Sequence, residues 1–282
     1  SPEVVCEGLL AGLALYLFVA HICTCEQPFI EPGLFRDRNF SVGLLFIFMI
    51  GMILLATMAL LPPFMQNLMG YPVLDVGQLL APRGVGTMLA MMAVGRLAGR
   101  VDVRRLIFLG LALTSLSLWE MTGFTAEVSG WDIVRSGFVQ GLGLGLIFVP
   151  LSTLTFATLA PRYRTEGTAL FSLMRNIGSS IGIAVVIGYL AQRTQANHAA
   201  FADYLTPFSL ALRQAGEAGV YDLGTAQGLA ALNGEVTRQA LTLAYLQDFR
   251  LMMFITLATV PLLLLLRAPP PGASSPAGVV QE

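Results

Sequence analysis

Charged residues are scarce in this chain. They account for 12% of its 282 residues, roughly half the share of about 25% that is usual in soluble domains. Lysine is absent, so all 16 basic residues are arginines, and the formal net charge is −1. This balance gives no reason to expect nucleic acid or an acidic substrate as a partner. Hydrophobic residues make up 55% of the chain and the mean hydropathy is +0.73. These proportions predict an integral membrane protein.

Residues that usually carry catalysis are also scarce. The chain has two histidines, His21 and His198, no phosphate-binding loop, and no pair of carboxylates within one apolar run. An ATP-driven pump and an embedded hydrolase are therefore not expected. We predict no catalytic residues, no cofactor and no enzyme activity.

The three cysteines, Cys6, Cys23 and Cys25, lie in or beside the first apolar run. Cys23 and Cys25, together with His21 and Glu26, could suggest a metal site. However, Cys23 and Cys25 are two residues apart and would point in different directions on a helix. No second cluster of ligands exists in the sequence, so no metal is expected.

Long apolar runs are the dominant pattern. A membrane span needs about twenty apolar residues to cross roughly 30 Å of hydrocarbon. The first run follows an acidic flank, unlike a signal peptide, and the chain begins at Ser1 rather than Met, which suggests a fragment or a processed chain. The tail 268–282, rich in Pro, Gly, Ala and Ser, is expected to be disordered. The expected fold is all-α, with about seven spans near 8–25, 41–65, 77–95, 105–124, 133–159, 166–190 and 247–266.

Arginines predict the orientation of these spans. Four of them fall between residues 96 and 105, at the junction of two apolar runs, and cytoplasmic connections collect arginine. Placing this turn in the cytoplasm puts the N-terminus outside and the C-terminus inside. The long connection 192–246 then lies outside. Its part 226–246 is apolar at helical spacing, and we expect an amphipathic helix along the membrane surface, or a solvated helix packed on the loop.

Glycines within two of the runs predict close helix packing. Small residues spaced by four lie on one helix face and let a second helix approach closely. Packing alone accounts for this pattern, although smooth faces would also let helices slide or rock. Pro150 is expected to kink the fifth run. The glycines are Gly137, Gly141 and Gly145 in the fifth run, and Gly178 and Gly182 in the sixth.

Charged residues within apolar runs are candidates for functional sites. Arg83, in the third run, and Arg175, followed by Asn176 in the sixth, could serve a cavity or a gate, or could bond helix-end carbonyls or a carboxylate. Gln140 could face a water-filled cavity, and several methionines could contact varied ligands or simply pack. Three further residues are expected to reach the membrane interface: Asp75, Glu120 and Arg135.

The stretch 95–106 resembles the conserved cytoplasmic motif of the major facilitator superfamily. Asp102 stands where that motif has its second glycine; it could pair with Arg104 or Arg105, or cap the following helix. Five other segments, 34–40, 81–88, 140–145, 150–152 and 175–182, make the chain similar to the EmrB/QacA-type drug:proton antiporters with fourteen spans. The motif residues expected to gate the cytoplasmic side are Gly95, Gly99, Arg100, Asp102, Arg104 and Arg105.

This resemblance implies a place for the chain within a larger transporter. Residues 1–40 would hold a linker helix and its cytoplasmic connection, and residues 41–267 the C-terminal six-helix bundle, in which Arg83, Gln140, Arg175 and Asn176 lie at the cavity or the bundle interface. An N-terminal bundle would be a partner outside this chain and would hold the main proton carrier. Alternating access rocks one bundle against the other around substrate.

The implied function is proton-coupled efflux of small lipophilic substrates through a bacterial inner membrane. The partners would be the lipid bilayer, protons, and a periplasmic adaptor with an outer-membrane channel, whereas nucleic acid is not expected. Two alternatives stay open: an exporter of one metabolite with the same fold, and a non-transporting membrane scaffold or accessory module.

Overall fold

The computed structural model describes residues 2–24, 31–97, 100–205 and 225–266, all of them helical or in short connections. Seven long helices follow the order of the seven expected apolar runs, which confirms the all-α expectation for this part of the chain. They are α1 (Pro2–Thr24), α2 (Arg38–Asn67), α3 (Val73–Leu97), α4 (Val103–Met121), α5 (Gly130–Phe156), α6 (Arg164–Tyr204) and α8 (Ala226–Thr259), together with the short α9 (Leu262–Leu265) and the 3-10 turns η1 (Pro32–Arg36) and η2 (Pro161–Tyr163).

Short polar residues start four of the long helices, and the fourth is α8, which Thr225 caps. Asp37 accepts a hydrogen bond from the backbone N–H of Phe40 at 2.9 Å and so begins α2. Asp102 and Ser129 cap α4 and α5 in the same way. Each cap satisfies a backbone donor that the first helical turn leaves unpaired.

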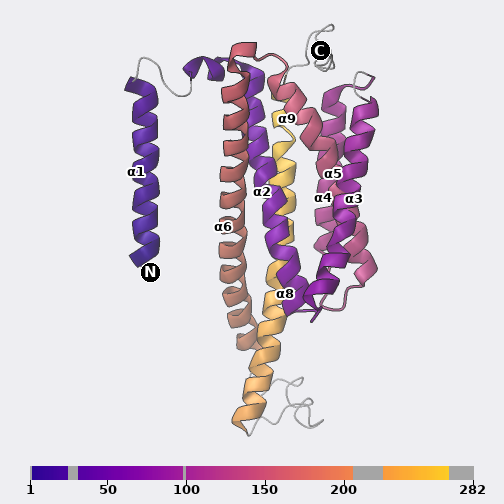
Figure 1. Cartoon of the computed structure of the whole chain (residues 1–282). Coiled ribbons are helices and arrows are strands. Elements are labelled where there is room, and N and C mark those ends of the chain that lie inside the picture. Colours follow the sequence, from indigo (N-terminus) through magenta and orange to yellow (C-terminus); the bar gives the residue numbers. More distant parts are fainter. Residues whose placement is uncertain (1, 25–30, 98–99, 206–224, 267–282) are drawn as a thin grey trace.

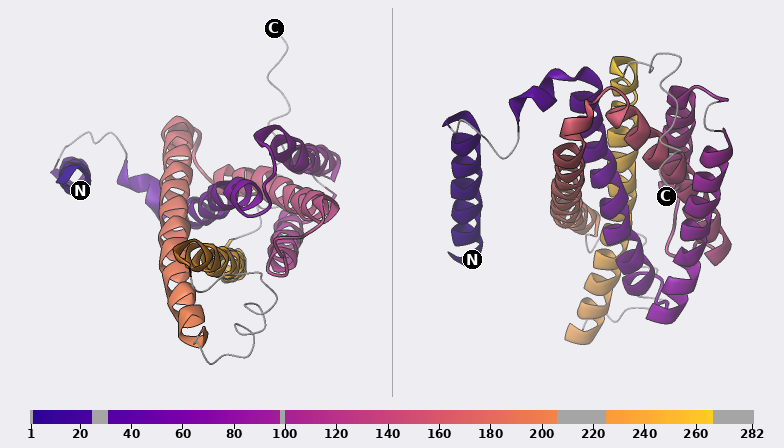
Figure 2. Two further views of the ribbon diagram at one scale, coloured as in Figure 1. Left: turned by 90° about the horizontal axis from the view of Figure 1, so that it is seen from below. Right: turned by 45° about the horizontal axis from the view of Figure 1, so that its top comes forward.

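Six helices form one bundle, and α1 stands apart from it (Figures 1 and 2). Within the bundle, α5 packs against α3 on one side and α4 on the other, and α2 packs against α6. Helix α8 closes the bundle by contacting α6, α4 and α2. A cluster of aromatic rings lies where α2, α8 and the end of α4 meet: Phe64, Phe124, Tyr245 and Phe249.

The two tightest helix pairs meet at glycines. On α3 and α5, Gly141 abuts the backbone carbonyl of Arg83, and a Cβ added to Gly145 would lie 2.6 Å from the carbonyl oxygen of Thr87. On α2 and α6, Gly178 abuts the carbonyl of Phe48, and a Cβ added to Gly182 would lie 2.6 Å from the carbonyl oxygen of Met52. Gly137 is less crowded, since its added Cβ would lie 3.9 Å from the Cβ of Arg83. At the other four glycines, close contact with the backbone of the neighbouring helix leaves no room for a side chain.

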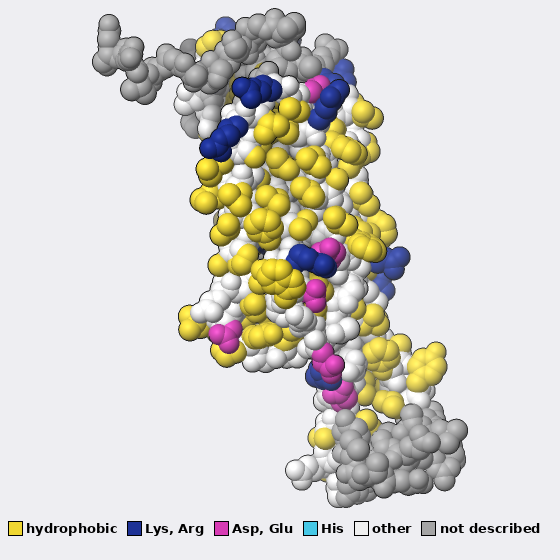
Figure 3. All heavy atoms as spheres, turned by 90° about the vertical axis from the view of Figure 1, so that its right-hand side faces the viewer, with side chains coloured by type: hydrophobic (Ala, Val, Ile, Leu, Met, Phe, Trp, Pro, Cys, Tyr) yellow, Lys and Arg dark blue, Asp and Glu magenta, His cyan; other side chains and the backbone are white. Residues whose placement is uncertain are grey.

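The charges divide the bundle into two ends and a middle. We call the end that holds Arg38, Arg100, Arg105 and Arg164 the arginine-rich end, and the other the opposite end. On the face shown in Figure 3, several arginines gather at the top, most acidic side chains lie in the lower half together with further arginines, and a broad hydrophobic band lies between these charged regions. This banding is what a lipid bilayer requires of a protein that spans it.

Four helices of the described residues are long and apolar enough to cross a membrane: α2, α5, α6, and α8 together with α9. Helices α3 and α4 occupy expected spans but are not among these four helices. Helix α3 contains Asp75, Arg83 and Arg96, and the nineteen residues of α4 contain Arg104, Arg105 and Glu120. Their hydropathy is lowered by charges at the helix ends and, in α3, by Arg83.

The helix expected at 226–246 is present, but as the first part of α8 rather than as a separate helix along the membrane surface. Helix α8 runs unbroken from Ala226 into the last span, and α6 continues to Tyr204, so the two project together beyond the opposite end (Figure 1). The amide of Asn197 donates to the carbonyl of Ala240 at 3.2 Å, and His198 lies 3.0 Å from the Asn233 amide oxygen. Within this stretch Ala240, Ala244 and Tyr245 are buried within the protein, whereas Leu229 and Leu243 are exposed. The connection 206–224 and the tail 268–282 lie outside the described residues.

Substituting Gly141 with alanine should destabilise the protein. An added Cβ would overlap the Arg83 carbonyl, and overpacking of this kind costs about 1–3 kcal/mol. Gly188→Ala is the matched control, because Gly188 lies on α6 with open space around its Cα and alanine is the better helix former. Thermal unfolding of the purified full-length protein in detergent should show a lower midpoint for Gly141→Ala alone; equal midpoints for the two variants would contradict the packing.

Candidate functional site

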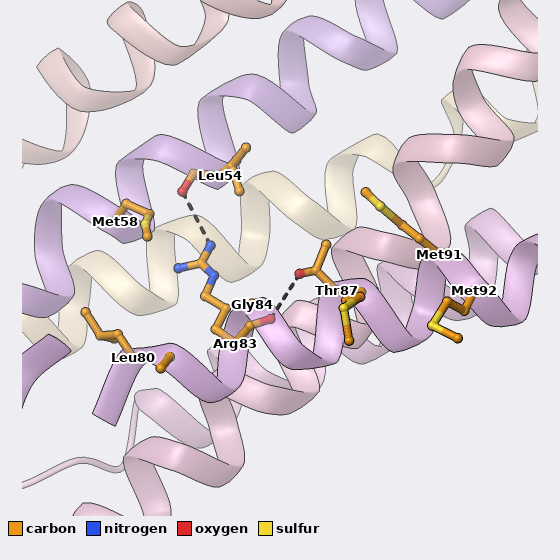
Figure 4. Close-up of a pocket in the computed structure, with 10 residues that line it drawn as sticks. Leu54, Met58, Leu80, Arg83, Gly84, Thr87, Met91 and Met92 are labelled. Carbon is orange, nitrogen blue, oxygen red and sulfur yellow. Dashed lines mark hydrogen bonds between the residues drawn. The ribbon is translucent and has the colours of Figure 1, made fainter. Parts of the chain in front are cut away.

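A groove between α2 and α3 has a volume of about 810 Å³. This volume lies within the range of small-molecule sites, roughly 300–1,000 Å³. All of its lining comes from these two helices, and most of it is apolar (Figure 4). The lining residues are Leu54 and Met58 on α2, and Leu80, Ala81, Arg83, Gly84, Thr87, Met88, Met91 and Met92 on α3.

Arg83 is the charged residue of this groove. Only 5% of it is exposed, and its side chain extends from α3 toward α2 (Figure 4). Its Nη2 donates to the backbone carbonyl of Leu54 at 3.5 Å, which is a long hydrogen bond. Its Nη1 has no hydrogen-bond partner in the described part of the chain, and none of the ion pairs found there includes Arg83. A buried guanidinium therefore retains an unused donor.

The α3–α5 contact fixes the position of Arg83. Its backbone carbonyl lies against Gly141 and also accepts a hydrogen bond from the Thr87 hydroxyl at 3.0 Å. The same hydroxyl lies 3.1 Å from the carbonyl oxygen of Gly141, so it links the two helices. The backbone of α3 is held against α5 at Arg83, whereas the side chain of Arg83 extends toward α2. Arg83 lies ten residues after the start of α3, about 15 Å along the helix axis and so deep within the bundle.

Methionines form much of the rest of the groove. Met58, Met88, Met91 and Met92 are exposed in this structure, with between 37% and 57% of each accessible. Methionine is unbranched and polarisable, so a surface of this kind adapts to apolar groups of varied shape. The groove thus combines an adaptable apolar wall with one deep positive charge.

The other predicted cavity residues do not line this groove. Gln140 is fully buried between α5 and α2, where its Nε2 donates to the Thr57 hydroxyl at 3.4 Å. The guanidinium of Arg175 lies 5.8 Å from the centroid of the Phe148 ring, which joins α6 to α5. Asn176 is exposed. The structure therefore brings Arg83 and Arg175 to different places on the bundle.

The turn between α3 and α4 contains the motif residues. The Oδ1 of Asp102 accepts from the backbone N–H of Arg104 at 3.0 Å, so Asp102 caps α4. The described residues contain no ion pair between Asp102 and either Arg104 or Arg105. Gly95, Arg100 and Arg105 are exposed, whereas the Nε of Arg104 is buried and has no hydrogen-bond partner there. Gly99 lies outside the described residues.

Charges at the opposite end also find partners. Arg135, at the start of α5, lies 3.4 Å from the carboxylate of Glu120 on α4 and 3.9 Å from that of Asp132. The expectation that Glu120 and Arg135 reach the interface separately overlooked this pairing. Asp75 is exposed in the first turn of α3.

Asp248 is a buried carboxylate that the sequence analysis missed. It lies on α8 between Tyr245 and Phe249 of the aromatic cluster and is 0% exposed. Neither of its carboxylate oxygens has a hydrogen-bond donor among the described residues. The sequence does contain a sign of its burial, because Asp248 follows an apolar stretch that begins at Ala240. The predicted last span begins at residue 247, so Asp248 falls at its edge rather than inside it.

Comparison with known proteins identifies the family. The chain matches the Major Facilitator Superfamily over residues 25–183, more than half of its length. The chain belongs to the Major Facilitator Superfamily. This is a family of transporters rather than enzymes, and with its apolar helices the chain is a multi-pass membrane protein.

The relatives of this chain include proteins named for resistance or export. It is 25% identical over 270 residues to the fatty acid resistance protein FarB of Neisseria gonorrhoeae, covering 95% of this chain and 53% of the relative. It is 27% identical over 212 residues to the multidrug export protein EmrB of Escherichia coli K12, covering 74% of this chain and 41% of the relative. It is 29% identical over 187 residues to the lincomycin resistance protein LmrB of Listeria innocua, covering 66% of this chain and 40% of the relative. The chain spans about half the length of these relatives.

Replacing Asp248 with asparagine should leave the protein as stable as before, or more stable. An unpartnered buried charge costs several kcal/mol, and asparagine has nearly the same shape without the charge. Asp132→Asn, which removes a half-exposed partner of Arg135, is the control and should change the free energy of unfolding by at most about 1 kcal/mol. A clearly lower unfolding temperature for Asp248→Asn than for Asp132→Asn would show that Asp248 is an ion-paired carboxylate.

Proposed function

We propose that this chain is the C-terminal half of a proton-coupled multidrug efflux permease that moves lipophilic compounds out of the cell by alternating access. The observation that carries this proposal is the groove between α2 and α3, which is apolar and holds a buried arginine with an unused donor. Residues 41–267 are the transporter bundle in this proposal, and residues 1–40 supply a linker helix and its connection.

The position of the groove supports this proposal. In the antiporters that the sequence resembles, the first and fourth helices of a bundle line the cavity, and the second and fifth meet the other bundle. In this chain the first and fourth helices are α2 and α5, and the second and fifth helices are α3 and α6. The groove therefore opens where a second bundle would face this one, which is the usual place of substrate in alternating access. The relatives, named for export or resistance and about twice as long, support the same reading.

The proposed orientation places the arginine-rich end in the cytoplasm of a bacterium, beneath the inner membrane. The C-terminus is then cytoplasmic, because α8 and α9 run toward that end (Figure 1). The concentration of arginine at the turn between α3 and α4 supports this choice. The motif from Gly95 to Arg105 would then regulate closure on the cytoplasmic side, with Asp102 fixing the start of α4.

The projecting ends of α6 and α8 would then lie in the periplasm. Their exposed polar surface, which includes the Glu235–Arg238 ion pair at 2.8 Å, could not stay in lipid and is suited to an aqueous compartment. We propose this projection as the contact for a periplasmic adaptor and an outer-membrane channel. We place the main proton carrier in the N-terminal bundle, outside this chain.

Proton-driven efflux by the full-length product of the reading frame that encodes this chain tests the proposal. Inverted vesicles with an imposed pH gradient should accumulate tetraphenylphosphonium and a lipophilic weak acid, and collapse of the gradient with nigericin should stop both. Arg83→Ala should change this accumulation because it removes the charge of the groove. Arg193→Ala, at an exposed position on α6 that does not line the groove, is the control and should leave accumulation unchanged.

Two results would contradict the proposal. Gradient-independent accumulation would exclude coupling to protons, and no accumulation of any lipophilic probe would exclude multidrug export. Unchanged accumulation in both Arg83→Ala and Arg175→Ala would remove these arginines from the mechanism.

A further inference from the structure

The substrate class follows from the charge pattern of the groove, given the proposed export function. A buried polar group without a partner costs free energy, and a buried charge costs more. Arg83 is 5% exposed and keeps Nη1 unpaired within the described part of the chain. An anion that reached Nη1 would accept a hydrogen bond from it and would also offset the positive charge of the guanidinium.

The lining disfavours a cation. None of its ten residues is acidic or aromatic, so no carboxylate and no ring face would receive a positive group. Arg83 itself would repel one, and in an apolar groove such repulsion is weakly screened. The groove therefore discriminates by charge sign as well as by hydrophobicity.

The apolar wall specifies the rest of the ligand. From Gly84 to Met92 the wall runs along α3 for eight residues, about 12 Å. Figure 4 shows Met91 and Met92 farther along α3 than Arg83, and Met58 across the groove on α2. A ligand that spans this wall has an anionic head at Arg83 and a long flexible apolar body along the methionines.

We propose that the groove binds amphipathic anions, with the anionic head on the guanidinium of Arg83 and the apolar chain along Met88, Met91 and Met92. A long-chain carboxylate is the simplest compound of this class. Arg83 thereby becomes the residue that selects substrates by charge, rather than a residue that only holds α3 to α2.

Binding and export of two probes of opposite charge test this inference. The probes are oleate and tetraphenylphosphonium, and the proteins are the full-length wild type, Arg83→Gln, Arg83→Lys and the control Arg193→Gln. Oleate binding to purified protein should weaken at least tenfold in Arg83→Gln and largely recover in Arg83→Lys, which restores the charge. Tetraphenylphosphonium binding should hold or strengthen in Arg83→Gln, which also shows that the variant is folded. Arg193→Gln should match the wild type with both probes.

The outcomes separate this inference from the export proposal. Equal weakening of both probes in Arg83→Gln would overturn the inference, and would point to a carboxylate on the other bundle as the partner of Arg83. Export of tetraphenylphosphonium without any oleate binding would also overturn it, while leaving the proposed export intact. Arg83-dependent oleate binding without export of either probe would support the inference and contradict the export proposal.

Discussion

Backbone contact at glycines is the constraint on which the rest of this structure depends. Helices in lipid gain little from burying apolar side chains against each other, so close approach and well-fitted surfaces must hold them together. Gly141 and Gly145 bring α3 onto α5, and Gly178 and Gly182 bring α6 onto α2. Since α2 and α5 also pack together, these contacts fix all four helices as one unit. The groove lies at the edge of that unit.

Arg83 joins this packing to function. Its carbonyl belongs to the glycine contact with α5, while its side chain belongs to the groove that faces α2. Its backbone is held against α5, and its guanidinium is buried with one donor unpaired within the described residues. Functional sites are where such local costs are expected, and the neighbouring methionines supply adaptability in place of rigidity.

Sequence patterns predicted the helices well and the partners of individual residues poorly. Apolar runs and the spacing of Gly137, Gly141 and Gly145 are local signals, so the helices and their close faces could be anticipated. Hydropathy could not show that α8 continues through 226–246, because the same apolar spacing fits a helix on lipid and a helix on protein. It also could not pair Glu120 with Arg135, or show that Asp248 is buried, because both depend on neighbours distant in the chain. Arg83 was recognisable as a charge inside an apolar run, but its unused donor emerges only once α2 lies beside α3.

In the proposed mechanism, the positive charge of Arg83 faces substrate rather than a fixed partner. An experimental structure of the full-length transporter with oleate bound tests it most directly. Carboxylate density is expected within about 3 Å of Nη1 of Arg83, with the hydrocarbon chain along Met88, Met91 and Met92. A carboxylate side chain of the other bundle paired with Arg83, with oleate absent from the groove, would contradict it.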